Sequence, residues 1–106
     1  MFESEEDNEY FKNKSQKIKY LLFLLNFERS FLDLIMKGNL TEDKVSYGFA
    51  YIVALCTDKQ KREQIYNEFE NLKNDGISTN QSASLALGLL TDYILEQLDI
   101  IDTQTF

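Results

Sequence analysis

Few residues in this sequence have side chains suited to covalent or acid–base chemistry. Cys56 is the only cysteine, and the chain of 106 residues contains no histidine. The absence of histidine removes the commonest general base and the commonest ligand of transition metals. Cys56 falls on an apolar stripe at helical spacing, which is typical of a small buried side chain and not of a reactive thiol. We therefore expect a protein that is not an enzyme, with no catalytic residue, metal site or cofactor.

The first ten residues carry five acidic side chains and no basic one. Clustered carboxylates suggest a site for a hard cation such as Ca²⁺, but this cluster lacks the ligand spacing and the turn glycine of an EF-hand loop. Like charges at this density repel each other and leave little apolar surface to bury. We therefore predict a flexible acidic head over residues 1–9 and a single helical domain over residues 10–106. The acidic residues of the head are Glu3, Glu5, Glu6, Asp7 and Glu9.

Basic residues gather directly after the head, at Lys12, Lys14, Lys17 and Lys19. Nucleic-acid binding is one interpretation of such a patch. The chain as a whole has a formal net charge of −7, however, which repels phosphate backbones and anionic lipid surfaces. Its most apolar stretch, residues 18–25, is far shorter than the ~20 residues needed to span a bilayer. We expect neither nucleic acid nor a membrane as a partner, and a cytoplasmic location.

Helix start and stop signals divide the rest of the chain. Thr41, Asp58 and either Ser78 or Thr79 are side chains that cap helix N-termini. Gly38 and the Asn-Asp-Gly sequence at residues 74–76 are stop and turn signals. Residues 49–56 could also form a buried strand, but no nearby segment offers a second strand to pair with. The signals therefore predict an all-α protein, a small bundle of four to five helices, with helices over about residues 10–36, 41–56, 58–74 and 79–101.

Apolar residues recur at helical spacing in each of these segments, which predicts one buried stripe per helix. The stripes of the second, third and fourth segments consist of Val45, Phe49, Ile52, Val53 and Cys56, then Ile65, Tyr66, Phe69 and Leu72, then Ala83, Ala86, Leu87, Leu90, Ile94 and Ile101.

The first and last helices carry more apolar residues than a single stripe needs. Either they are the two central helices of a compact bundle, or part of each faces a partner. On the second interpretation we expect a homo-oligomer that also binds an elongated helical protein. The candidate partner-binding residues form one row on each helix: Tyr20, Phe23, Leu24 and Phe27, and Leu85, Leu89 and Tyr93.

A family resemblance rests on four segments: the acidic residues 3–9, the lysine-rich residues 12–19, and the apolar residues 20–31 and 85–101. In this arrangement the chain resembles the small tail assembly chaperones of siphophages that infect Gram-positive bacteria. The resemblance implies a helical chaperone that coats the long tape measure protein during virion assembly in the host cytoplasm.

Two other resemblances remain open. The turn at residues 72–78, followed by a helix, is similar to the inter-helix turns of bacteriocin immunity proteins, although those proteins are usually basic and this chain is acidic. A phage-encoded inhibitor of a host defence protein is the third interpretation. Acidic inhibitors often mimic DNA, but the acidic residues here are concentrated at the two ends of the chain.

Overall fold

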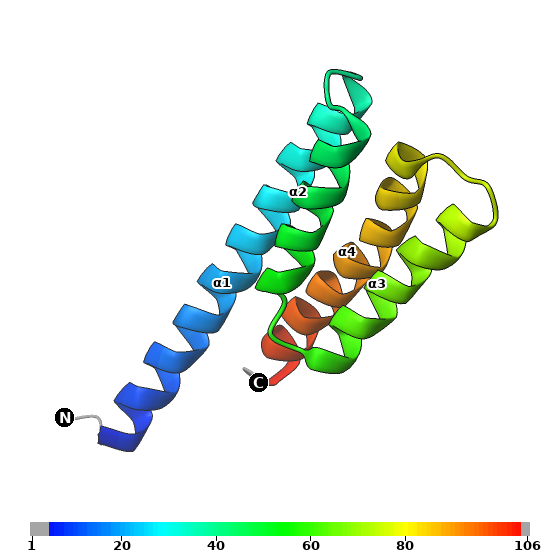
Figure 1. Ribbon diagram of the computed structural model, residues 1–106. Helices are drawn as coiled ribbons and strands as arrows, with labels where there is room; N and C mark the ends of the chain where they lie inside the picture. Colours follow the sequence, from blue (N-terminus) through cyan, green and yellow to red (C-terminus); the bar gives the residue numbers. More distant parts are fainter. Residues whose placement is uncertain (1–4, 105–106) are drawn as a thin grey trace.

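Four α-helices make up the computed structural model, which describes the backbone of residues 5–104 and the side chains of residues 13–101. They are α1 (Glu5–Met36), α2 (Glu42–Leu55), α3 (Lys59–Asn74) and α4 (Thr79–Gln104) (Figure 1). The described backbone contains no strand, so the all-α prediction is confirmed, with four helices where four to five were expected. The alternative of a strand over residues 49–56 is wrong, because residues 49–55 lie in α2.

The helices run alternately up and down, and α4 is the central one (Figure 1). It packs on all three other helices, whereas α1 and α3 make no contact with each other within the described residues. The molecule is elongated, 61 Å by 25 Å by 19 Å, because the first turns of α1 extend past the other helices (Figure 1). The helix begins at Glu5, so residues 5–9 of the predicted acidic head belong to α1, while residues 1–4 lie outside the described residues.

The predicted capping residues begin the last three helices. The Thr41 side chain accepts a hydrogen bond from the Lys44 amide, and Asp58 accepts one from the Lys61 amide. Ser78 accepts one from Gln81, which selects Ser78 over Thr79 as the N-cap of α4. Each bond satisfies an amide in the first turn that has no partner within the helix, which stabilises the helix by about 1 kcal/mol.

Two glycines end helices as the sequence predicts. Gly38 follows α1 with a φ of +73°, and Gly76 follows α3 with a φ of +90°. These values lie in the left-handed region, where a residue with a Cβ atom is strained. Both positions therefore turn the chain sharply into the next helix.

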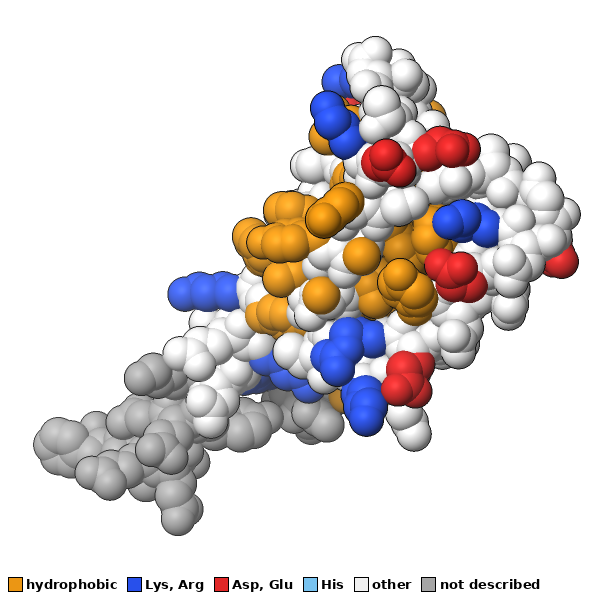
Figure 2. Space-filling model, in the orientation of Figure 1, with side chains coloured by type: hydrophobic (Ala, Val, Ile, Leu, Met, Phe, Trp, Pro, Cys, Tyr) orange, Lys and Arg blue, Asp and Glu red, His pale blue; other side chains and the backbone are white. Residues whose placement is uncertain are grey.

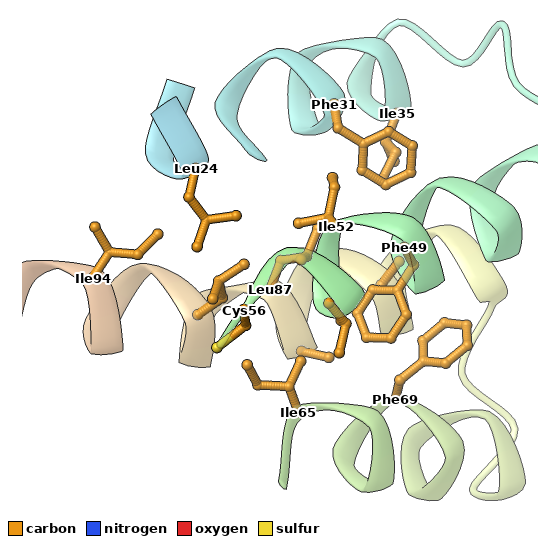
Figure 3. Packing of buried hydrophobic residues seen from close by; sticks show 14 of the residues in the cluster. Leu24, Phe31, Ile35, Phe49, Ile52, Cys56, Ile65, Phe69, Leu87 and Ile94 are labelled. Carbon is orange, nitrogen blue, oxygen red and sulfur yellow. The ribbon is translucent and has the colours of Figure 1, made fainter. Parts of the chain in front are cut away.

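The predicted stripes form one core between the helices. Every stripe residue of the second and fourth segments is buried, and Ile65 and Phe69 are buried from α3. Tyr66 is partly exposed, so it belongs to the surface and not to the stripe. The Phe49 and Phe69 rings stack with centroids 4.2 Å apart, and they lie side by side in Figure 3. Each such side chain stabilises the fold by about 1.5–3 kcal/mol through burial.

Candidate functional site

A groove with apolar walls runs along the outer face of α1. It has a volume of about 500 Å³. Apolar side chains gather over the middle of α1 and α2 on the face of the molecule shown in Figure 2. We call the groove the α1 groove. It is lined by Phe23, Asn26, Phe27, Ser30, Phe31 and Leu34.

Contacts between α1 and α2 hold the aromatic wall of the groove in place. The Phe27 ring lies between Phe23 and Tyr51, with centroid distances of 5.9 Å and 5.7 Å respectively. Deeper in the groove, the Phe31 ring packs directly on Gly48 of α2. Because Gly48 has no side chain, the two helices approach closely here, and the Phe31 ring forms the floor of the groove.

The first predicted row is divided between surface and core. Phe23 is 56% exposed and Phe27 is 38% exposed, and both line the groove. Tyr20 is partly buried, and its hydroxyl group donates to the Leu55 carbonyl (2.6 Å) and accepts from the Thr57 amide (3.0 Å). The Tyr20 hydroxyl group therefore pairs with two backbone groups at the C-terminal end of α2.

Leu24 was expected to face a partner, but the structure buries it within the chain. Its exposed fraction is 0%, because it shares the buried stripe of α1 with Leu21 and Phe31. Figure 3 shows Leu24 pointing into the interior, towards Ile94 of α4. A side chain in this position cannot reach a partner unless α1 leaves the bundle.

The second predicted row lies on α4 and contributes no wall to the α1 groove. Leu85 is 53% exposed, but Leu89 and Tyr93 are partly buried and pack against the core. The Lys61 ammonium group lies 5.9 Å from the centre of the Tyr93 ring. The most exposed members of the two rows, Phe23 and Leu85, therefore do not line one groove.

A second, shallower hollow lies between α2 and α3, where Figure 2 shows a further group of apolar side chains. Its volume is about 370 Å³, and its lining includes Ala50, Ala54, Arg62 and Tyr66. Sequence analysis did not identify it. The small residues Ala50 and Ala54, one turn apart on α2, were the available signal.

Glu28 is a buried polar residue that sequence analysis also missed. Among the side chains of residues 13–101, it is the only acidic or basic one that is buried, with an exposed fraction of 0%. It lies at the middle of the α1 stripe, where the spacing of three and four residues places it in line with Leu24 and Phe31. That spacing was the signal in the sequence. Burial raises the pKa of the Glu28 carboxyl group from 4.5 to about 7.

Glu28 reaches across the interface between α1 and α4. Its Oε1 atom contacts the hydroxyl oxygen of Thr91, while its Oε2 atom has no hydrogen-bond partner in the described structure. The Thr91 hydroxyl also lies 3.3 Å from the carbonyl oxygen of Leu87. A carboxyl group with one partner in an apolar interface is costly when it is ionised.

Among the described side chains, the remaining candidate for chemistry is Cys56, whereas the side chains of the acidic cluster at residues 3–9 lie outside the described residues. Cys56 is fully buried, as the sequence predicts, and burial raises the pKa of its thiol. A thiolate is therefore disfavoured at this position. Within the described residues, no group of three or more His, Cys, Asp or Glu side chains is arranged to hold a metal ion. In the same part of the chain, no helix combines the length and the apolar character needed to cross a membrane.

Comparison with known proteins does not assign the chain to a family. No model of a known protein family, no curated protein and no solved structure matches it. The candidate function therefore rests on the α1 groove and on the chemistry of its side chains.

Proposed function

We propose that this protein is a non-enzymatic interaction protein that binds an apolar α-helix of another protein in the α1 groove. The observation that carries the proposal is the exposed apolar row of α1, in which Phe23, Phe27 and Leu34 line one groove. Recognition of a helix in a groove depends on large apolar side chains at helical spacing, and a few of them supply most of the affinity.

The dimensions of the row suit a helix as the ligand. Phe23 and Leu34 are eleven residues apart in α1. At 1.5 Å per residue they span about 16 Å, or three turns of a partner helix. Asn26 and Ser30 supply neutral polar groups at the same surface. The groove thus favours an amphipathic helix with an uncharged apolar face.

The resemblance to siphophage tail assembly chaperones supplies a finer form of the proposal. In that form, the partner is the tape measure protein, and copies of this chain coat its apolar helical surface and associate with one another. Gene order tests this assignment independently of the groove. Genes for a tape measure protein and a major tail protein next to this one support it, and their absence from a complete neighbourhood contradicts it.

Fluorescence anisotropy with a labelled synthetic amphipathic helix tests the groove itself. The peptide carries leucine at four positions along one face and glutamine and alanine elsewhere. We expect wild-type protein to bind it and Phe23→Asp to weaken binding at least about tenfold, because an aspartate in the apolar wall loses its solvation on binding.

Leu85→Asp is the matched control for this experiment. Leu85 is exposed to nearly the same extent as Phe23 but lies on α4, outside the groove. We expect Leu85→Asp to bind the peptide as wild type does. Loss of binding in Leu85→Asp alone would place the site on α4, and equal binding by all three proteins would refute the groove as the binding site.

A further inference from the structure

The interface between α1 and α4 contains a chemical feature that the proposed binding function does not use. Glu28 is fully buried there, at the centre of an otherwise apolar stripe. The interfaces of α3 with α2 and α4 bury no charged side chain among the described residues. Ionisation of a buried group therefore acts on the contact that holds α1 to the bundle.

The hydrogen-bond geometry indicates where the proton lies. The Thr91 hydroxyl group has one hydrogen atom, and it is next to two acceptors, Glu28 Oε1 and the Leu87 carbonyl oxygen. The carbonyl has no hydrogen to offer. Both contacts become full hydrogen bonds only if Thr91 donates to Leu87 and the Glu28 carboxyl group donates to Thr91. This arrangement requires a protonated Glu28.

The charged groups around Glu28 do not stabilise the ionised carboxylate enough to offset the effect of burial on its pKa. Burial is the main cause of its raised pKa, and the charge of Asp92 on α4 raises the pKa further. Opposing this, a Thr91 hydroxyl group that donated to the ionised carboxylate would lower the pKa, and the charge of Arg29 on α1 lowers it, in each case by less than burial raises it. Helix α2, the other element packed on α1, contributes no charge to the environment of Glu28.

We propose that Glu28 and Thr91 form a proton-controlled latch, in which protonated Glu28 holds α1 docked on α4 and ionisation of Glu28 weakens that docking, so that α1 is released more often. Ionised Glu28 would keep one oxygen without any donor, because Oε2 has no partner. Release of α1 gives the carboxylate access to water. The same stripe carries Phe31, so release also removes the floor of the α1 groove.

Hydrogen exchange at two pH values tests the latch in the intact protein. The exchange rates of α1 and α3 amides are measured at pH 5.5 and pH 8 and divided by the intrinsic rates. We expect the protection of α1 amides around residues 21–35 to fall by about 30-fold at the higher pH. This is the linkage expected when the pKa of the Glu28 carboxyl group returns from about 7 to its ordinary value of 4.5 on release of α1. Protection in α3 should fall less.

The variant Glu28→Gln removes the titrating group but keeps a donor for Thr91. We expect its α1 protection to change less than about threefold between the two pH values. Glu96→Gln, at an exposed position of α4, should behave as wild type does. The same pH response in wild type and Glu28→Gln would overturn the latch, and so would an equal fall in α1 and α3, because the whole bundle would then be opening.

A direct titration keeps the test decisive if Glu28→Gln does not fold. Carbon-13 NMR of the glutamate carboxyl groups in the wild-type protein gives the midpoint for Glu28 itself. We expect a midpoint near pH 7, coupled to chemical-shift changes in the Thr91 amide. A midpoint near the ordinary value of 4.5 would overturn the proposal.

Discussion

The ring of Phe31 on α1 lies directly against the backbone of Gly48 on α2. A Cβ atom built at Gly48 would overlap the Phe31 ring. The contact joins the buried core to the α1 groove, because Phe31 is part of both. An aromatic ring and a glycine thus set the distance between two helices.

Substitution of Gly48 by alanine tests this contact. We expect Gly48→Ala to destabilise the protein by about 1–2 kcal/mol, because the cost of overpacking exceeds the ~1 kcal/mol by which alanine favours a helix over glycine. Gly88 of α4 is the matched control, since a Cβ atom there meets nothing within 4 Å. Gly88→Ala should stabilise the protein by about 0.5–1 kcal/mol in urea denaturation. A stabilising Gly48→Ala would contradict the close packing.

The Tyr20 hydroxyl group links α1 to the end of α2 through its bonds with Leu55 and Thr57. Removal of the hydroxyl leaves a carbonyl and an amide without this partner, so we expect Tyr20→Phe to lower the free energy of unfolding by about 1–2 kcal/mol. Tyr47 is 82% exposed and serves as the control. Tyr47→Phe should change stability by less than about 0.5 kcal/mol in the same denaturation series. Equal effects of the two substitutions would show that the Tyr20 bonds do not contribute.

Adjacent residues of α1 should respond in opposite ways to a new charge. Leu24→Asp places an unpaired carboxylate in the core, which costs several kcal/mol, and we expect the helical circular dichroism signal to collapse. Phe23→Asp adds a charge at an exposed position, and the helical signal should remain within about 10% of that of wild type, since surface changes are usually small. Retention of the fold by Leu24→Asp would mean that α1 packs through another face.

The raised pKa of Glu28 predicts an unusual dependence of stability on pH. Between pH 4.5 and about 7 the folded chain keeps a proton that the unfolded chain has lost. The free energy of unfolding should therefore fall as pH rises through this window and level off above it, with a total loss on the order of 2–3 kcal/mol from this group. Urea denaturation from pH 4.5 to pH 8 measures it. Subtraction of the Glu28→Gln profile removes the contribution of the other carboxylates, and a flat difference would contradict the prediction.

The helices and most of the core follow from local features of the sequence. Thr41 and Asp58 cap helices because a side-chain oxygen and an amide three residues later are brought together by the first helical turn. The stripes of α2 and α4 could be predicted for a similar reason. Each helix has one apolar face, and that face is buried against the other helices.

The orientation of α1 could not be predicted in this way. Its residues 18–36 are apolar on almost every side, so periodicity does not separate Phe23 from Leu24. The choice depends on which side of α1 meets α4, and on the α2 side the Phe31 ring packs where Gly48 leaves room for it. The burial of Glu28 depends equally on distant residues, since its partner Thr91 lies 63 positions along the chain. Local sequence encodes the helices because their hydrogen bonds span four residues, whereas the groove and the partner of the buried carboxyl group arise from contacts between helices that are far apart in the sequence.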